Sequence, residues 1–583
     1  MGVFLSRKAS RRPPPTRVVK YVPERAAAPL TTLEQLLNYK DPLLCAVEPL
    51  NVTIRRGRPE DPKNLFCHDM MGGYHEDRFV HGSEDNDQYR FHHWHAINTF
   101  VYYTHNLVTI PPPGWISAAH RHGVKVLGTF MLESDEGLTI IKAIKDAGLG
   151  PQVAEKLAFV ATLGRFDGWL VSIGCRVDSS CVTFLKDFLA AIAEKTHSAV
   201  PGSMVIWYDA VDTLGNATPH NELNNSNSSF FELCDGIFLN FHWTEDTLQK
   251  SAQLAGDRKA DVYVGVDVFG RDTHYSGGFN TSEAVKTVRT HGLSAAIFAA
   301  GWVYETRLKN SFIKNQYRLW DFPDDICPEW RFTALPISTS FCQGLGHSRF
   351  SAGARVSSRP WFNLAKQQLQ PRDQGNTLHR QCGSATVYLK DAYNGGSCLR
   401  VLFNANKQRP DEVPYFRLFS CDFLLGALVV SYAFKHTDAR KFASQDVALV
   451  LKAKTAAGDT EEIFLGMVAT QPEGDNYVLR REAAGVPAEA SDVLEPKWTT
   501  RSYYLQDKRG AEGATLDEIG VRLFYAGPDA EWCLLGQLDV KRPEESSATA
   551  DPGGVAGPSK VVQDYEPVEK RPRMAEPKIS VAG

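Results

Sequence analysis

Eight apolar, strand-like runs alternate with helical stretches between residues 65 and 305, and this alternation restricts the fold more than any other feature of the chain. Helical periodicity is clearest at Glu136–Leu163 and Cys181–His197, where apolar residues recur at intervals of three and four. Buried strands that alternate with helices indicate a parallel sheet. The eight runs are Leu65–Met71, Thr99–Thr104, Lys125–Leu132, Gly168–Gly174, Ser203–Ala210, Gly236–Trp243, Val262–Phe269 and Ala295–Tyr304.

Eight strand–helix units in about 250 residues match the arithmetic of a (β/α)₈ barrel. No GxGxxG segment follows the first strand, which argues against a dinucleotide-binding sheet. We therefore expect a TIM barrel over residues 40–340.

The pattern changes after about residue 350, where the helical period fades and short β-rich runs are separated by Gly, Asp, Asn and Pro. This spacing predicts antiparallel β-sandwich structure over residues 350–540, either as one sandwich or as two smaller ones. The expected fold class is α/β, with a (β/α)₈ barrel followed by a β-sandwich region. The predicted runs are Ala385–Leu389, Ser397–Phe403, Ala427–Phe434, Asp446–Leu451, Glu462–Val468, Arg501–Leu505, Gly520–Tyr525 and Trp532–Val540.

Both ends of the chain have the composition of disordered segments. Residues 1–30 are basic and rich in Pro, and residues 543–583 are rich in Pro, Glu, Ser and Ala. Met1–Ser6 fits the N-myristoylation pattern, so we expect membrane contact only if Gly2 is acylated. We expect no secretory signal, because the apolar run at Val3–Leu5 is too short for one.

Charge and cysteine content limit the possible partners. The net charge is −4, from 64 basic and 68 acidic residues, so nothing favours nucleic acid as a partner. The 11 cysteines show no CxxC or Cys/His spacing of the kind that binds zinc. We interpret them as reduced thiols of a cytoplasmic protein and expect neither a metal nor a cofactor.

The ends of the predicted strands carry most of the candidate site residues, because chemistry in a barrel takes place at the C-terminal ends of its strands. Aromatic rings stack on the C–H faces of sugars, and carboxylates and amides accept hydrogens from sugar hydroxyls. The set therefore predicts a site for a sugar or another small molecule. Its members are Asp69, Tyr102, His105, Glu133, Tyr208, Asn240, Trp243, Asp267, Arg271, Trp302, Tyr304 and Glu305.

Each of these residues taken alone has a structural alternative. Asp267 could cap a helix, and His105 could be a structural histidine. The prediction of a site rests on their convergence on one rim. The fourth run differs from the others, since it ends in Ser172 and Gly174, which neither donate a proton nor hold a charge at neutral pH.

Several segments spread along the chain carry a further signal: His68–Tyr74, His120–Val124, Arg165–Leu170, Trp207–Asp209, Asn221–Asn224, Val262–Phe269, Gly301–Glu305 and Asp391–Ser397. Together these segments resemble one family, the cytosolic endo-β-N-acetylglucosaminidases of glycoside hydrolase family 85. The resemblance covers roughly residues 40–540.

The resemblance implies cleavage between the two core N-acetylglucosamines of N-glycans, assisted by the substrate's own acetamide. The family orients that acetamide with an Asn and donates the proton from a Glu two residues later on the fourth strand, and these positions here are Ser172 and Gly174. It further implies that Tyr208 lies near the oxazoline intermediate. The residues implied to hold the sugars are Glu133, Asn240, Trp243, Asp267, Trp302 and Tyr304.

Three explanations of the substituted pair stay open at this point. The segment 171–182 could differ from the true gene product. The chain could be an inactive relative that binds N-glycans. Another carboxylate could replace the missing acid, with Glu133, Asp135 or Asp178 as candidates.

Overall fold

The computed structural model describes residues 25–40, 47–71, 73–372, 374, 383–403, 415–436, 445–472, 474–482, 497–525 and 531–543. Gly2 and nearly all of the two predicted tails lie outside these residues. Ala26 and Leu30, at the end of the predicted N-terminal tail, form β-bridges to Phe79 and Val108.

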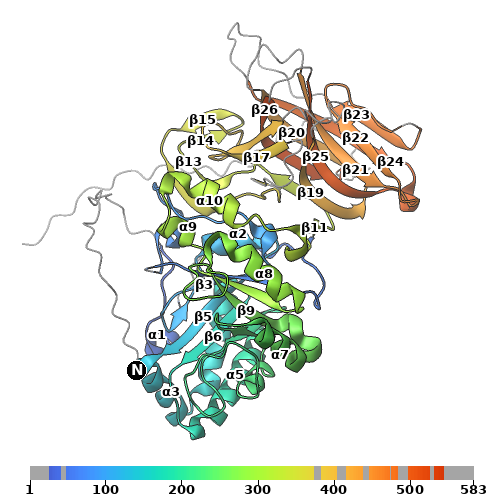
Figure 1. Cartoon of the computed structure of the whole chain (residues 1–583). Coiled ribbons are helices and arrows are strands. Elements are labelled where there is room, and N and C mark those ends of the chain that lie inside the picture. Colours follow the sequence, from blue (N-terminus) through green and yellow to red (C-terminus); the bar gives the residue numbers. More distant parts are fainter. Residues whose placement is uncertain are drawn as a thin grey trace, which may run out of the picture. The chain divides into compact units, whose positions relative to one another are not determined.

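A closed ring of parallel strands forms the first part of the fold (Figure 1). The nine-stranded sheet runs in the order β3-β2-β10-β9-β8-β7-β6-β5-β4, and an additional pairing between β3 and β5 closes it. β4 (Val108–Thr109) pairs antiparallel with β5, which leaves eight parallel strands in the ring. These are β2 (Asn64–Asp69), β3 (Thr99–Tyr103), β5 (Lys125–Glu133), β6 (Gly168–Gly174), β7 (Met204–Tyr208), β8 (Gly236–Leu239), β9 (Val262–Asp267) and β10 (Ser294–Phe298). The predicted barrel is confirmed.

The helices of the barrel lie outside the strands, as Figure 1 shows for α3, α5 and α7. The predicted helical stretch 136–163 is in fact two helices, because Gly148 between them takes a left-handed conformation with φ of 64°. The helices of the described residues are α1 (Leu33–Leu37), α2 (Pro113–Arg121), α3 (Ser134–Asp146), α4 (Gly150–Gly164), α5 (Ser179–Ala199), α6 (Ser228–Phe231), α7 (Glu245–Ala255), α8 (Thr281–Thr290), α9 (Trp302–Glu305) and α10 (Phe312–Leu319). None of them is both long and apolar enough to cross a bilayer.

Side chains alternate between the inside and the outside of the barrel strands. On β5, Leu127 and Met131 belong to the cluster that fills the barrel interior, whereas Phe130 and Leu132 pack in the outer core beneath the helices. The eighth strand is shorter than the predicted run. It ends at Phe298 because the chain turns at Ala299, whose φ is 60°, and Trp302 already begins α9.

The second part of the described chain is a β-sandwich. The order of the six-stranded sheet is β1-β11-β19-β25-β21-β22 and that of the seven-stranded sheet is β17-β18-β26-β20-β24-β23, with β12 on β26. Leu449 and Phe419 of the first sheet share one apolar core with Val430 and Leu538 of the second. The two sheets therefore make one sandwich rather than two smaller ones.

Six of the eight predicted runs are extended in the structure, whereas β18 and β22 are each one residue shorter than predicted, and one long strand, β19, escaped prediction. Their bounds are β1 (Ile54–Arg55), β11 (Arg331–Phe332), β12 (Ile337–Thr339), β17 (Gly383–Tyr388), β18 (Cys398–Phe403), β19 (Tyr415–Leu424), β20 (Ala427–His436), β21 (Gln445–Lys454), β22 (Thr460–Leu465), β23 (Tyr477–Glu482), β24 (Thr499–Asp507), β25 (Thr515–Tyr525) and β26 (Glu531–Lys541). Two small pairs complete the fold, β13 (Gln343–Gly346) with β16 (Trp361–Gln367) and β14 (Arg349–Ser351) with β15 (Ala354–Ser357).

The barrel contacts β16 through buried polar and apolar groups. Helix α2 packs against β16. The indole N–H of Trp94 donates to Oε1 of Gln367 over 2.6 Å, and Nε2 of Gln367 donates to the carbonyl of Phe91 over 2.9 Å. Since these groups are buried, the contact satisfies polar atoms that would otherwise lose their bonds to water.

Replacement of Gly168 by Ala tests the close approach of the first residue of β6 to the backbone of Met204 on β7. Gly168 has φ of 133°, and a Cβ there would lie 1.9 Å from the carbonyl oxygen of Met204. We expect the substitution to lower the free energy of unfolding by at least about 2 kcal/mol, measured by urea denaturation. The matched control is Gly174→Ala on the same strand, whose added Cβ would meet only the Cγ of Glu133, at 3.5 Å. Equal free energies of unfolding for the two variants would contradict the described backbone conformation of Gly168 and its close approach to Met204.

Candidate active site

The mouth of the barrel collects the last inward-facing residues of its strands. Leu170 of β6 lies in the barrel interior, so the two-residue repeat turns Ser172 and Gly174 toward the mouth on the same strand. Met131 of β5 and Ile206 of β7 also lie in the barrel interior. The same repeat therefore turns Glu133 and Tyr208, each two residues further along its strand, toward the mouth. The inward positions at this end include Asp69, Glu133, Ser172, Gly174, Tyr208 and Asp267.

Strand register places Ser172 and Gly174, the two positions predicted to match the family pair, beside two other candidate residues. Gly174 of β6 pairs with Glu133 of β5, and Ser172 pairs with Tyr208 of β7. Ser172 is buried, with a relative exposure of 2%, whereas Gly174 is partly exposed. A Cβ added at Gly174 would meet the Cγ of Glu133 at 3.5 Å, an ordinary van der Waals distance. The position therefore has room for a Cβ.

Glu133 contacts His105, which follows the neighbouring strand β3. Nδ1 of His105 lies 3.2 Å from Oε2 of Glu133. The hydrogen bond and the charge of Glu133 together raise the pKa of His105, although partial burial of the ring opposes the shift. The Glu133 side chain is 43% exposed, so the pair is open to a ligand.

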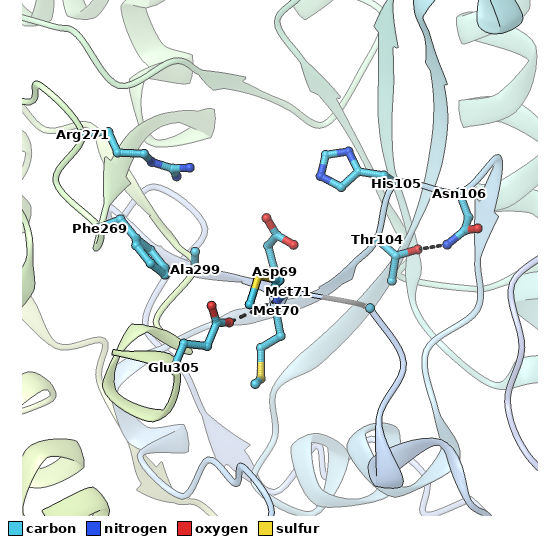
Figure 2. A pocket seen from close by; sticks show the side chains of 11 residues that line it. Asp69, Met70, Met71, Thr104, His105, Asn106, Phe269, Arg271, Ala299 and Glu305 are labelled. Atoms are coloured by element: carbon cyan, nitrogen blue, oxygen red, sulfur yellow. Dashed lines mark hydrogen bonds between the residues drawn. The ribbon is translucent and has the colours of Figure 1, made fainter. Parts of the chain in front are cut away.

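Two neighbouring cavities lie at the mouth and share His105 and Asn106. The larger has a volume of about 500 Å³, and Figure 2 shows its side chains. It is lined by Asp69, Met70, Met71, Gly73, Thr104, His105, Asn106, Phe269, Arg271, Ala299 and Glu305. The smaller, of about 270 Å³, is lined by Thr31, His105, Asn106, Leu107, Met131, Leu132, Glu133, Ser134, Glu136, Gly137 and Ile140.

Asp69 lies between Arg271 and His105 in the larger cavity (Figure 2). Burial raises the pKa of Asp69, and Glu305 adds to this effect, while His105 and Arg271 oppose it. A carboxyl whose charged form is disfavoured in this way is suited to hydrogen bonding with a neutral polyol.

Asp267 supports Arg271 rather than lining either cavity. Its two carboxylate oxygens accept hydrogen bonds from Nε and Nη2 of Arg271 over 2.8 and 2.9 Å, and they also accept from the backbone N–H groups of Phe269 and Arg271. Asp267 is buried, whereas the Arg271 side chain is 64% exposed. The carboxylate thus holds the guanidinium at the mouth.

Four other predicted site residues lie away from both cavities. The indole N–H of Trp243 donates to the carbonyl of Gly265 over 2.7 Å, and the ring is buried. Nδ2 of Asn240 donates to the carbonyls of Asp209 and His220. The Arg307 guanidinium covers the ring of Trp302 at 4.3 Å.

The fourth, Tyr304, donates through its hydroxyl to the carbonyl of Asp87 over 2.8 Å. All four residues therefore hold loops around the mouth. Asp69, His105, Arg271 and Glu305 line the larger cavity, although the site prediction did not include them among the sugar contacts. The signal that marked these four residues was their position at, or within a few residues of, the C-terminal end of a predicted strand.

Within the described ranges, no group of three or more His, Cys, Asp or Glu side chains could hold a metal ion. The described cysteines are all free thiols, and all but Cys327 are buried.

Comparisons with known proteins place the chain among glycosidases. Residues 74–349 match the model of glycosyl hydrolase family 85. The chain is 43% identical over 536 residues to a Mus musculus protein named cytosolic endo-beta-N-acetylglucosaminidase, over 88% of this chain and 71% of that protein. It is 44% identical over 342 residues to the Gallus gallus protein of the same name, over 58% of this chain and 47% of that protein.

The chain spans about half the length of some of these relatives. The Homo sapiens protein of that name is 41% identical over 384 residues, which are 64% of this chain and 51% of that protein. The solved glycoside hydrolase domain of Endo-D from Streptococcus pneumoniae R6 superposes with a TM-score of 0.68 at 16% identity, covering 89% of this chain and 84% of that one. That structure supports the fold described above.

A titration of His105 tests the contact at the mouth. We expect Glu133→Gln to lower the pKa of His105 toward its ordinary value, because the substitution removes the carboxylate that stabilises the imidazolium. NMR of labelled histidine side chains, with His105→Gln for assignment, would measure it. His220 is the control, since Asp209 raises its pKa. An unchanged titration of His105 would rule out the described contact.

Proposed function

Because the chain belongs to glycosyl hydrolase family 85, we propose that it is an endo-β-N-acetylglucosaminidase that cleaves the chitobiose core of N-glycans. The proposal rests on family membership together with one observation on the site. Glu133, Tyr208 and the positions of the substituted pair lie on three adjacent strands at one mouth of the barrel. Named relatives of the chain carry this activity in their names.

The substrates would be N-glycans on glycoproteins or as free oligosaccharides. The relatives are named cytosolic, and we place this chain in the cytosol as well. Buried free thiols agree with a reducing compartment. Nucleic acid has no part in the proposal, and a membrane enters it only if Gly2 is acylated.

The mechanism would begin with the acetamide oxygen of the substrate, which attacks the anomeric carbon and forms an oxazolinium ion. Tyr208 would lie beside this intermediate, since it pairs with Ser172. Ser172 is shorter than the Asn that the family uses to orient the acetamide, and Gly174 supplies no acid. Loss of a general acid costs about 10²–10⁴ in rate, so the proposed enzyme is slow.

Glu133 is the proposed sugar contact with the most direct access, since it lines the smaller cavity. Asp267 would act through Arg271, which lines the larger one. Asn240, Trp243, Trp302 and Tyr304 would shape the rim through the loops that they hold.

A second candidate function is an inactive N-glycan-binding protein. It is favoured by the glycine at position 174, where the family has its proton donor. The two candidates differ in turnover and agree in binding.

Incubation of the purified chain with a high-mannose glycopeptide distinguishes the two candidates. We expect slow release of the oligosaccharide, leaving a peptide that carries a single N-acetylglucosamine, detected by mass spectrometry. Glycan binding without any cleavage would favour the inactive binding protein, and the absence of both would refute the family site.

Restoration of the family pair tests the cause of the low rate. The double substitution Ser172→Asn with Gly174→Glu supplies the amide that orients the acetamide and the acid that protonates the leaving oxygen. We expect it to raise kcat, by at most about 10⁴-fold. Gly174→Gln with Ser172→Asn is the matched control, since it adds equal bulk without an ionisable group. An equal gain in both variants would show that packing, not acid catalysis, limits the rate.

A further inference from the structure

Position 174 lacks a side chain, and the nearest group to it is the side chain of an acid on the next strand. Gly174 and Glu133 are register partners in the pairing of β6 with β5. The Cγ of Glu133 lies 3.5 Å from the point where a Cβ at position 174 would stand. The carboxyl carbon of Glu133 is one bond beyond that Cγ, and the carboxyl carbon of a glutamate at 174 would be two bonds beyond its Cβ. Both carboxyl groups can therefore occupy the same part of the mouth.

We propose that Glu133 is the proton donor and acceptor of this chain, in place of the acid that the family carries at position 174. This inference rests on the function proposed above. Gly174 supports this role of Glu133, because the space that a side chain at position 174 would fill is left open to the Glu133 side chain.

The exposure of Glu133 and the cavity around it support the role. The side chain is 43% exposed and lines the smaller cavity. His105 and Asn106 line both cavities, so the Glu133 carboxylate stands next to the larger one. Its hydrogen bond with His105 holds the carboxylate at the mouth.

Three other carboxylates near this end, Asp178, Asp135 and Asp69, are less suited to the role. Asp178 caps α5, where its Oδ1 accepts from the backbone N–H of Cys181 over 3.0 Å and from the hydroxyl of Ser180. Asp135 lies on the exposed first turn of α3 and lines neither cavity. Asp69 is on β2, which is separated from β6 by β3 and β5.

The chemistry balances with Glu133 alone. As the acetamide oxygen bonds to the anomeric carbon, the bond from that carbon to the leaving oxygen breaks, and protonated Glu133 gives its proton to the leaving oxygen. Water then attacks the anomeric carbon of the oxazolinium ion, the acetamide oxygen departs, and the Glu133 carboxylate takes the proton of the water.

The first test compares Glu133→Gln with Asp135→Asn in the full-length chain on a high-mannose glycopeptide. We expect Glu133→Gln to lower kcat at least about 10²-fold and Asp135→Asn to leave it unchanged. Persistent activity of Glu133→Gln would overturn the inference and leave the proposed function intact. A wild-type chain that cleaves nothing while the Ser172→Asn, Gly174→Glu variant does would also overturn the inference, but it would support the family site.

The second test uses the leaving group to separate acid catalysis from a structural role. A glycoside of the same oligosaccharide with 4-nitrophenol needs little proton donation, because the nitrophenolate leaves as an anion. We expect Glu133→Gln to lose at least about tenfold less activity on this glycoside than on the glycopeptide. Equal losses on the two substrates would overturn the role as an acid.

The third test adds an acid at the empty position. In the variant Glu133→Gln with Gly174→Glu, the new carboxyl takes the place of the old one, and we expect cleavage of the glycopeptide to return at least to the wild-type rate. This variant keeps the Glu133→Gln substitution, so recovered activity also shows that a chain with that substitution folds. A double variant that binds glycan but stays inactive would show that Glu133 serves another purpose.

Discussion

Closure of the barrel on a filled interior is the constraint on which the site depends. Most inward positions below the mouth hold apolar or aromatic side chains such as Leu127, Leu170 and Tyr263, which pack against one another. The last inward residue of each strand is therefore the first that can face a ligand. This placement also removes water from around Asp69 and Tyr208, and burial raises the pKa of both. The packing that stabilises the barrel thus also sets the electrostatics of its mouth.

Register between neighbouring strands then decides which groups can act together. Parallel pairing sets Glu133 opposite Gly174, and Ser172 opposite Tyr208. The loss of a side chain at one position changes what its partner can reach, since the two share one part of the mouth. In the proposed enzyme, the glycine at position 174 leaves the carboxyl of Glu133 in the same part of the mouth.

The loops around the mouth obey a different requirement, the satisfaction of buried polar groups. Asp267 binds Arg271, Trp243 binds the carbonyl of Gly265, and Tyr304 binds the carbonyl of Asp87. Aromatic and carboxylate side chains, whose chemistry suits them to bind sugars, are thus equally suited to holding loops in place through hydrogen bonds. Only the groups that these loops leave open, among them Arg271 and Glu133, remain available to a ligand at the mouth.

The sequence by itself determined the alternation of strands and helices, the barrel, and the absence of an ionisable side chain at Ser172 and Gly174 on the fourth strand. Local periodicity is sufficient for this, and the predicted run Lys125–Leu132 differs from β5 by one residue. Tertiary structure alone decided that Glu133 faces Gly174, that Ile54 and Phe332 join a sheet with the distant strand β19, and that Asp267 binds Arg271 instead of a ligand. The physical reason is that periodicity encodes which face of a strand is buried, whereas register and loop contacts depend on how all the strands close together.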